Sequence, residues 1–370
     1  MMNVLTNVYI FGARATAAGV YKSLSKLEGN KQIKAFIVTD SADNPLNIWG
    51  VPVWSLHEIS ELLSAEEKSA AEVYIATPQF FHEEISYLLQ KSGFKKLIMV
   101  TSEQEAYIME RYYESERLFP SIHKLLLPSN DSLFPYISIY VACFFRDKKV
   151  ANLPRRPGYM KRLLLGCYLA RQSGVDIAKQ ADFYDDVRDN ISAKNPNCCE
   201  MTAHYWIWKN RLDTDDEYVG VYHYRRFLDM SDDDIRRMKA NDVDVVLPFP
   251  MIHYPSALIH HTWYVREEDW LVMRQVLREL YPEYDARFDE IFAQPYFYNY
   301  NIMIAKKSVF ADYCAWLFPI LAAIEDRSEP KGKDRADRYT AYMSESLTTL
   351  YFMYHQHDLK IYHTGRILYT

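Results

Sequence analysis

The first hundred residues alternate short apolar runs with helical patterns, and this alternation restricts the fold more than any other feature of the chain. Four apolar runs have the length of buried strands: residues 8–11, 33–38, 72–76 and 96–100. Helical patterns lie between them, over residues 20–27, 55–63 and 82–93. Strands that alternate with helices pair in parallel, because each helix returns the chain to the start of the next strand. We therefore expect residues 1–112 to form a Rossmann-like parallel sheet domain.

The turn after the first strand departs from the dinucleotide-binding pattern. In that pattern, Gly-x-Gly-x-x-Gly, the second glycine lets the backbone approach a pyrophosphate. Here the turn begins at Gly12, with Arg14 where the second glycine should stand, and Asp40 follows the second strand. The domain is therefore expected to be accessory. The alternative hypothesis is a non-catalytic or NAD-dependent sugar-modifying protein that acts through this Rossmann-like domain.

The length of the chain indicates two domains. Single cores rarely grow beyond about 250–300 residues, and this chain has 370. Residues 113–135 contain Pro120, Pro128 and Pro135 without a sustained period, which is typical of a linker. Residues 136–370 begin with a second buried strand, YISIYVA, and are expected to form a second α/β domain.

Composition argues against several classes of protein. A net charge of −6 is unlike the basic surface of a nucleic-acid binder. The five Cys lack CxxC spacing, so neither a disulfide framework nor a zinc site is indicated, and a cytoplasmic location fits. No secretory signal precedes the first strand, and the apolar runs near residues 136–145 and 313–324 are shorter than the ~20 residues of a spanning helix. The 30 Tyr fit either a stacking surface or a Tyr-rich core.

The segment over residues 190–227 carries the strongest functional signal. It reads NISAKNPNCCEMTAHYWIWKNRLDTDDEYVGVYHYRRF and packs two Trp, four Tyr and two adjacent Arg around one short apolar run. Such groups are costly to bury in a plain core. They are suited to stacking a flat ring and holding a diphosphate.

Several pieces of the second domain together resemble a known family. They are Asp189-Asn-Ile-Ser192, Lys194-Asn195, Glu200-Met-Thr202, Tyr205-Trp206, Trp208-Lys-Asn210, Gly220 with His223-Tyr-Arg-Arg226, Tyr298-Asn-Tyr-Asn-Ile-Met303, Tyr313 with Trp316-Leu-Phe318, and Ser344-Glu345. Over residues 136–350 the chain resembles the bacterial capsular polysaccharide and exopolysaccharide biosynthesis glycosyltransferases, first registered as a domain of unknown function. It departs from their pattern at Phe144-Phe145, where the family has a His-Lys pair.

The resemblance implies a GT-A-like glycosyltransferase domain after the Rossmann-like one, within the α/β class. It implies transfer of a hexose, galactose-type favoured, from a nucleotide-diphosphate sugar, favoured as a UDP-hexose, to a glycan or lipid-linked glycan acceptor. On this reading the donor-binding residues are Asn190, Lys194, Tyr205, Trp208, Lys209, His223, Arg225 and Arg226. Asn301 is expected to face the acceptor.

The cluster His223-Tyr-Arg-Arg226 lies just past the carboxyl end of a predicted strand, where ligands bind in open α/β sheets. The order helix, loop, apolar strand, polar cluster is the one in which GT-A enzymes present an Asp-x-Asp metal motif. Arg225 and Arg226 could replace the metal on the diphosphate, or His223 could ligate Mn²⁺ or Mg²⁺. Alternatively, the two Arg pair with the surface carboxylates of residues 232–234. Because neighbours on a strand face opposite sides, we expect one of the two Arg to point into the site.

An inverting transferase needs one carboxylate base near the acceptor hydroxyl. Glu345 is the first candidate and Asp337 the second, and the alternative for Glu345 is a helix-surface carboxylate. A literal Asp-x-Asp occurs at Asp242 and Asp244, but it precedes its strand. This places it at the amino end, so we interpret it as a solvated strand start rather than a metal motif.

Residues 146–162 form a local basic patch, with seven Lys or Arg against one Asp. Such a patch suits peripheral contact with the anionic inner face of a membrane that carries a lipid-linked acceptor, at ~1 kcal/mol per basic residue. The alternative is a solvated loop.

Overall fold

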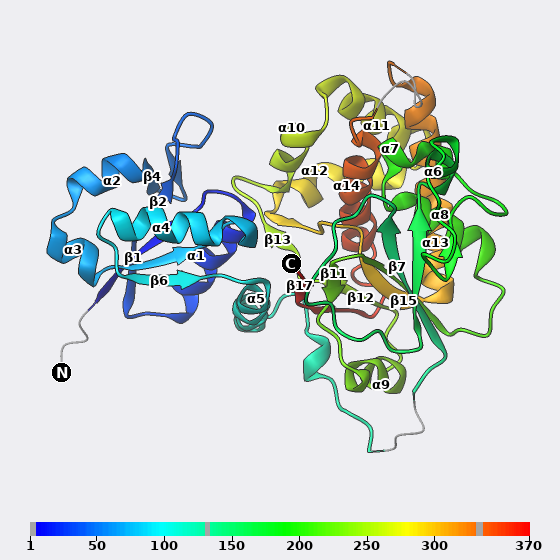
Figure 1. Cartoon of the computed structure of the whole chain (residues 1–370), viewed down its shortest axis with the longest axis horizontal. Coiled ribbons are helices and arrows are strands. Elements are labelled where there is room, and N and C mark those ends of the chain that lie inside the picture. The colour runs from blue at the N-terminus through cyan, green and yellow to red at the C-terminus, as the bar shows by residue number, and fades with distance from the viewer. Residues whose placement is uncertain (1–4, 130–133, 331–335) are drawn as a thin grey trace. The chain divides into compact units, whose positions relative to one another are not determined.

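The computed structural model describes residues 5–129, 134–330 and 336–370, which fall into two compact units. Unit 1 comprises Met1–Phe119 and Met251–Ala257, and unit 2 comprises Pro120–Pro250 and Leu258–Thr370 (Figure 1). Of the linker expected at 113–135, the first seven residues belong to unit 1, and residues 130–133 lie outside the described part. The division at 112 and 136 stays a prediction.

Unit 1 is built on a six-stranded sheet in the order β3-β4-β2-β1-β5-β6. The strands are β1 (Thr6–Phe11), β2 (Lys31–Val38), β3 (Asn47–Ile48), β4 (Val51–Ser55), β5 (Glu72–Ile75) and β6 (Lys96–Met99). All neighbouring pairs are parallel except β3 with β4. The helices are α1 (Ala15–Leu27), α2 (Leu56–Leu62), α3 (Ala65–Ala70), α4 (His82–Lys91) and α5 (Ser102–Glu116), with a 3-10 turn, η1 (Gln79–Phe81). The predicted α/β class with a parallel sheet is confirmed.

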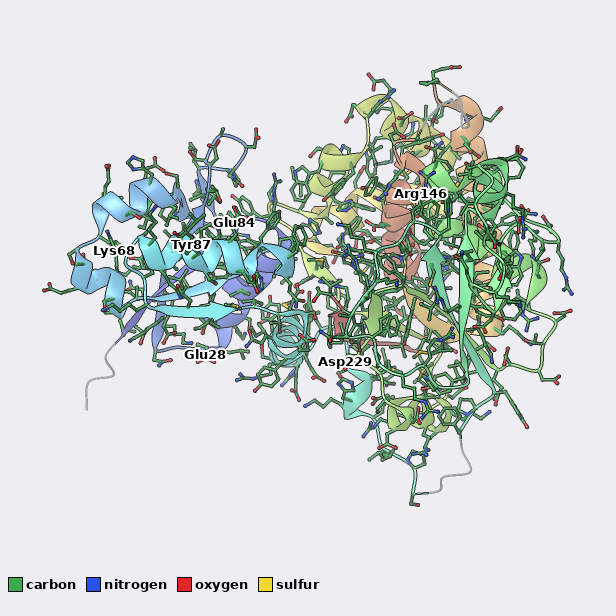
Figure 2. The ribbon with its side chains drawn as sticks, viewed as in Figure 1. Glu28, Lys68, Glu84, Tyr87, Arg146 and Asp229 are labelled. Carbon is green, nitrogen blue, oxygen red and sulfur yellow. The ribbon has the colours of Figure 1, made fainter. Side chains whose placement is uncertain are left out.

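Local chemistry accounts for several helix starts in this unit. The hydroxyl of Ser55 accepts from the backbone N–H of Glu58 at 3.2 Å, while the Glu58 carboxylate accepts from the Ser55 N–H at 2.7 Å. Ser64 and Glu67 form the same reciprocal capping box at α3. On α4 the polar face turns to solvent, with Tyr87 64% exposed (Figure 2).

Unit 2 contains a nine-stranded sheet in the order β16-β12-β15-β10-β7-β8-β9, to which β11 and β17 attach beside β10. Its strands are β7 (Ile137–Phe144), β8 (Met160–Leu165), β9 (Phe183–Tyr184), β10 (Tyr218–His223), β11 (Arg226–Leu228), β12 (Val245–Pro248), β15 (Met303–Lys306), β16 (Ile361–Thr364) and β17 (Arg366–Leu368). The strands β7, β8, β9 and β10 pair in parallel, whereas β15 runs antiparallel to both its neighbours. The carboxyl ends of the parallel strands therefore meet at one edge.

The helices of unit 2 cover this sheet (Figure 1). They are α6 (Cys167–Gln172), α7 (Asn195–Cys198), α8 (Met201–Asn210), α9 (Asp232–Ala240), α10 (His261–Tyr264), α11 (Glu267–Leu280), α12 (Pro282–Ala293), α13 (Lys307–Arg327) and α14 (Tyr339–Tyr354). Short elements complete the chain: the 3-10 turns η2 (Ile122–Lys124), η4 (Ser192–Lys194) and η5 (Ala257–His260), and the two-residue strands β13 (Met251–Ile252) and β14 (Tyr296–Phe297).

The centre of the unit 2 sheet, around β7 and β10, is so closely packed that Gly220 of β10 has no room for a side chain. All residues of β7 before its last are buried, as expected for a parallel strand covered on both faces. A Cβ added to Gly220 of β10 would lie 3.0 Å from Cγ1 of Ile304 and 3.1 Å from Cγ1 of Ile139. Glycine at this position therefore lets the two neighbouring strands, β7 and β15, carry Ile139 and Ile304 on either side of β10.

Helix α13 is longer than the apolar run that the sequence shows. Among the described residues it is the one helix long and apolar enough, by length and composition, to cross a membrane. It contains Pro319, and ten of its 21 residues are buried within the protein. The helix thus packs as part of the unit 2 core. All five Cys are free thiols.

Candidate active site

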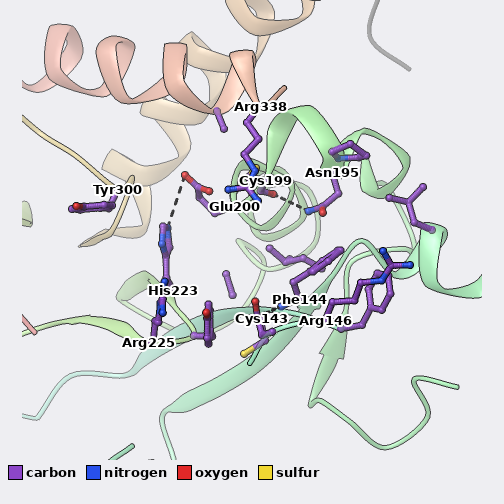
Figure 3. Close-up of a pocket in the computed structure, with 18 of the residues that line it drawn as sticks. Cys143, Phe144, Arg146, Asn195, Cys199, Glu200, His223, Arg225, Tyr300 and Arg338 are labelled. Carbon is purple, nitrogen blue, oxygen red and sulfur yellow. Dashed lines mark hydrogen bonds and ion pairs between the residues drawn. The ribbon is translucent and has the colours of Figure 1, made fainter. Parts of the chain in front are cut away.

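A cleft of about 780 Å³ opens at the carboxyl ends of β7, β8 and β10. It is closed on its other sides by the entry to α8, the segment before β15 and the first turns of α14 (Figure 3). Arg146, which follows β7, lies on its lining and is exposed (Figure 2). The volume is within the ~300–1,000 Å³ typical of small-molecule sites.

Two arginines enter this cleft from one hairpin. Strand β10 ends at His223, which pairs with Arg226 of β11, so Tyr224 and Arg225 form the two-residue turn between them. Both Arg225 and Arg226 line the cleft. The expectation that only one would do so assumed a continuing strand, and it is wrong because the alternation of side chains stops at the turn.

Within the described part of the chain, neither Arg225 nor Arg226 has a carboxylate within ion-pair distance. The carboxylates expected as alternative partners are engaged elsewhere: Asp232 with the Tyr159 hydroxyl at 2.6 Å, Asp233 with Arg236 at 2.6 Å, and Asp234 with Arg237 at 2.6 Å. The Nε of Arg225 is buried and has no hydrogen-bond partner. The hairpin therefore presents two guanidinium groups without a close ion-pair partner in the described residues, although their charges reach Asp147 and Glu200 across the cleft.

Tyr300 holds one of these groups in place. The guanidinium of Arg226 lies 4.6 Å from the centre of the Tyr300 ring, and that of Arg366 lies 4.8 Å from it. Burial, with the neighbouring charges of Arg225 and Arg366, lowers the pKa of Arg226 from its usual value. Positive charges are thus concentrated in a partly desolvated site, where an anion would gain most.

His223 stands between the arginines and a carboxylate. Its Nε2 lies 3.9 Å from Oε1 of Glu200 (Figure 3). Burial, reinforced by the charges of Arg226 and Arg225, lowers the pKa of His223 to about 3. The imidazole is therefore neutral near pH 7.

Glu200 immediately precedes α8 and reaches the cleft from that helix end. Its Oε1 accepts a 2.8 Å hydrogen bond from Nδ2 of Asn301. Burial is the main cause that raises the pKa of Glu200 to about 7, and the negative charge of Glu345 adds to the effect. Hydrogen bonding from Asn301 and the charge of Arg226 oppose this rise.

Glu345 lines the same cleft from α14 and is 8% exposed. Its Oε1 accepts from the backbone N–H of Tyr300 at 2.9 Å, and its Oε2 lies 3.3 Å from Nε2 of His260. The structure places the first sequence candidate for the base in the cleft, with both of its oxygens in contact with protein groups.

Tyr300 and Asn301 have left-handed backbone conformations, with φ of 79° and 47°. A bulky residue rarely adopts such a φ, and the cost is of order 1–3 kcal/mol. The surroundings hold the pair: Nδ2 of Asn301 also donates to Oγ of Ser344 at 2.9 Å, and its Oδ1 accepts from Oγ1 of Thr348 at 2.9 Å. Asn301, expected to face the acceptor, is 2% exposed and orients Glu200 instead.

Five residues expected around the donor lie outside the cleft lining: Asn190, Lys194, Tyr205, Trp208 and Lys209. Tyr205 and Trp208 share one face of α8, where both rings contact Phe318 of α13. Lys209 lies 3.5 Å above the Trp208 ring, and Lys194 pairs with Glu325 of α13 at 2.5 Å. Asn190 accepts from the Ser192 N–H at 3.2 Å and donates to the Arg188 carbonyl. From this segment the cleft is lined instead by Asn195 and Pro196 of α7 and by Cys199 and Glu200 just before α8.

Asp337, the second candidate for the base, also lies outside the cleft lining. Its Oδ1 accepts from the N–H of Tyr339 at 3.3 Å, and its Oδ2 lies 3.8 Å from Nη2 of Arg266. The carboxylate therefore accepts a hydrogen bond from the first residue of α14 and does not face the cleft.

The described residues contain no group of three or more His, Cys, Asp or Glu that could hold a metal ion. The Asp-x-Asp carboxylates lie just before β12 and pair with lysines of other segments. Asp242 lies 2.5 Å from Lys306 and 3.0 Å from Lys360, and Asp244 lies 2.8 Å from Lys306. A cation on His223 would also meet the charges of Arg225 and Arg226. The residues present therefore do not fit a metal bound at His223.

Sequence reasoning assigned no role to several residues of the cleft. Glu200 stood among the resembling pieces, and its place at the start of the aromatic helix was a usable signal. Asp147 follows β7, where its carboxylate accepts from the Phe144 N–H at 2.6 Å, and burial raises its pKa to about 6. Tyr300 also stood among the resembling pieces, but its left-handed conformation gave no signal, because it depends on contacts from distant segments.

A family model described as "Domain of unknown function (DUF4422)" matches residues 148–357. Among solved structures, the apo structure of WbbM, described as a bifunctional glycosyltransferase, is similar with 26% identity and a TM-score of 0.52, over 63% of this chain and 45% of that one. The chain thus spans less than half the length of WbbM. A structure of RSP, a Rex-family repressor, has 16% identity and a TM-score of 0.24, over 30% of this chain and 61% of that one. None of the curated proteins matches the chain. The fold of the chain is an α/β glycosyltransferase fold.

Proposed function

The chain belongs to the DUF4422 family, and we propose that it is a glycosyltransferase that moves a hexose from a nucleotide-diphosphate sugar to a glycan. The observation that carries the proposal is the pair Arg225 and Arg226, which lines a ligand-sized cleft without carboxylate partners in the described part of the chain. Guanidinium groups are planar and permanently charged, so they match a diphosphate in two-point contacts. The similarity to WbbM supports glycosyl transfer as the chemistry.

We propose that the two guanidinium groups take the place of Mn²⁺ or Mg²⁺ on the donor diphosphate. The support is the lack of a three-residue ligand group in the described residues, together with the positive field around His223. In this scheme Arg225 and Arg226 stabilise the charge that develops on the leaving diphosphate. Neutral His223 supplies a buried Nε2 without a hydrogen-bond partner beside them.

The finer assignments rest on the sequence resemblance. They are a GT-A type of sheet, a UDP-hexose donor of galactose type, and a growing capsular or exopolysaccharide acceptor, free or lipid-linked. A cytoplasmic protein at the inner face of the membrane would meet such an acceptor. Arg146, Lys148 and Lys149 are exposed beside the cleft, which supports contact with an anionic leaflet.

The test is calorimetric titration of the full chain with UDP-galactose, UDP-glucose and NAD, with manganese or with EDTA. We expect binding of a UDP-sugar that persists in EDTA and no binding of NAD. Binding only with manganese would contradict the role given to the arginines. If no common UDP-, GDP- or dTDP-sugar binds or is turned over with acceptor extract, the glycosyltransferase proposal fails.

A further inference from the structure

We infer that Glu200, and not Glu345, is the general base that takes the proton from the acceptor hydroxyl. The inference rests on the function proposed above and assigns one step of it. Glu200 lines the same cleft as the proposed diphosphate site. Only His223 lies between them: it contacts Glu200, and the turn that carries Arg225 follows it directly. The side chain of Glu200 is 14% exposed, so it is held in the protein yet open to the cleft.

The hydrogen bonds of the two carboxylates differentiate their roles. The two side-chain contacts of Glu200, with Asn301 and with His223, both involve Oε1, and its own backbone N–H also hydrogen-bonds to the carboxylate. Since both side-chain contacts lie at Oε1, we assign Oε2 to take the proton. Glu345 has a protein group at each oxygen, the Tyr300 N–H at Oε1 and His260 at Oε2. Glu345 is therefore a positioning residue, which holds the strained backbone at Tyr300 and places a negative charge near Glu200.

The charged and titratable groups around Glu200 come from several elements, and Arg338, the residue before α14, lines the same cleft. Arg226 of β11 favours the ionised form, while Glu345 of α14 and burial favour the protonated one. His204 of its own helix and His223 of β10 are both neutral near pH 7, because burial lowers their pKa values to about 4 and about 3. Glu200 consequently changes charge near neutral pH, which is the range in which a general base works best.

The step is a single displacement. The acceptor oxygen forms a bond to the anomeric carbon as the bond from that carbon to the diphosphate oxygen breaks. The bonding pair leaves with the nucleoside diphosphate, whose charge Arg225 and Arg226 hold, and the hydroxyl proton passes to Glu200. Attack from the side opposite the leaving group inverts the anomeric configuration.

The experiment compares wild type with E200Q, E200D and E345Q, using UDP-galactose as donor and water as the simplest acceptor, and measures UDP release. Removing a general base costs ~10²–10⁴-fold in rate. E200Q should lose this factor while its dissociation constant for UDP-galactose stays within about twofold, because the diphosphate site is intact. E200D should recover part of the rate.

The pH profile separates a base from a structural carboxylate. The wild-type rate should rise through pH ~7 as Glu200 ionises, and the E200Q rate should be flat. E345Q should move the wild-type midpoint to lower pH, because it removes the charge that disfavours ionised Glu200. An E200Q rate within threefold of wild type, with donor binding retained, would overturn the inference and leave the proposed function standing.

An infrared difference titration tests the ionisation of Glu200 without turnover, so it applies also where UDP-galactose and water do not react. The wild-type protein should show a protonated carboxyl band that disappears with a midpoint near pH 7, and this band should be missing in E200Q. A Glu200 band that disappears below pH 5.5 would contradict the proposal, since such a carboxylate is too weak a base.

Discussion

The two units end their parallel strands in opposite ways. In unit 1 the strand ends are closed by backbone contacts: the Gly12 N–H donates to the Ile37 carbonyl and the Ala76 N–H to the Phe11 carbonyl, both at 2.8 Å. Asp40, the residue suggested for a ribose, accepts from the N–H of Ala42 in its own turn at 3.0 Å.

In unit 2 the corresponding edge ends in charged side chains that line a cleft and form no close ion pair between Arg225 or Arg226 and a carboxylate in the described residues. Arg225 and Arg226 have no carboxylate partner in the described part of the chain, and Glu200 is buried beside neutral His223. The cleft lined by Arg225, Arg226 and Glu200 therefore lies at strand ends that leave polar groups facing it. The comparison favours unit 2 as the site of chemistry and an accessory role for unit 1.

The largest expected effect comes from removing both arginines. Each charge-assisted hydrogen bond contributes about 1.5–3 kcal/mol, so the double variant R225A/R226A should raise the donor dissociation constant by ~10²–10⁴-fold. R14A, at the strand end of unit 1, is the matched control and should leave donor affinity unchanged. If R14A weakened donor binding as much as R225A/R226A, the contrast between the two units would be lost.

The second effect is a pH dependence of stability that depends on Glu200. The folded-state pKa of about 7 lies above the unfolded value of about 4.3. Its stabilising contribution is therefore complete below pH ~4.3 and is lost as the pH rises through 7, because the folded state keeps a proton that the unfolded chain has released. Relative to E200Q, the wild type should lose about 3 kcal/mol of unfolding free energy between pH 4.5 and pH 7.5.

Urea unfolding of wild type and E200Q at several pH values measures this difference. E290Q, which alters an exposed carboxylate on α12, should follow the wild-type curve. Parallel curves for wild type and E200Q would show that Glu200 ionises like an exposed residue, and the electrostatic contrast with unit 1 would weaken.

The smallest effect concerns the closed edge of unit 1. Gly12 has a φ of 123°, and a Cβ there would lie 2.6 Å from the carbonyl oxygen of Ala76. G12A should therefore cost about 1–3 kcal/mol in the stability of unit 1, whereas G29A, whose Cβ would meet nothing within 4 Å, should be neutral. Thermal unfolding measures both variants. If G12A lost donor binding while unit 2 stayed folded, unit 1 would have to contribute to donor binding and would not be accessory.

Much of the fold could be predicted because its signals are local. The apolar runs that became β1, β2, β5 and β6 alternate with helices within unit 1, and the run that became β10 is followed directly by its polar cluster. Arg225 and Arg226 could be placed near a ligand edge for the same reason. Their joint orientation could not, because a two-residue turn replaced the expected strand.

Other parts of the site depend on contacts between distant segments. Trp208 and Tyr205 looked like a wall for the donor, yet the packing of α8 against α13 turns both rings toward Phe318. Asn301 looked like an acceptor contact, yet it is buried, donates to Ser344 and accepts from Thr348 of α14, and its amide also donates to Glu200. A helical period indicates which residues share a face, but the neighbouring element decides what that face meets.

By itself the amino-acid sequence determined the α/β class, the strands β1, β2, β5, β6, β7 and β10, and the segment that supplies the arginines, since apolar runs, turns and charge are properties of neighbouring residues. The tertiary structure alone decided that Met251–Ala257 belongs with unit 1, where Tyr254 contacts Trp49, and that Glu200, Tyr300 and Glu345 share one cleft. The raised pKa of Glu200 follows from this arrangement, because burial and the charge of Glu345 act through space and not along the chain.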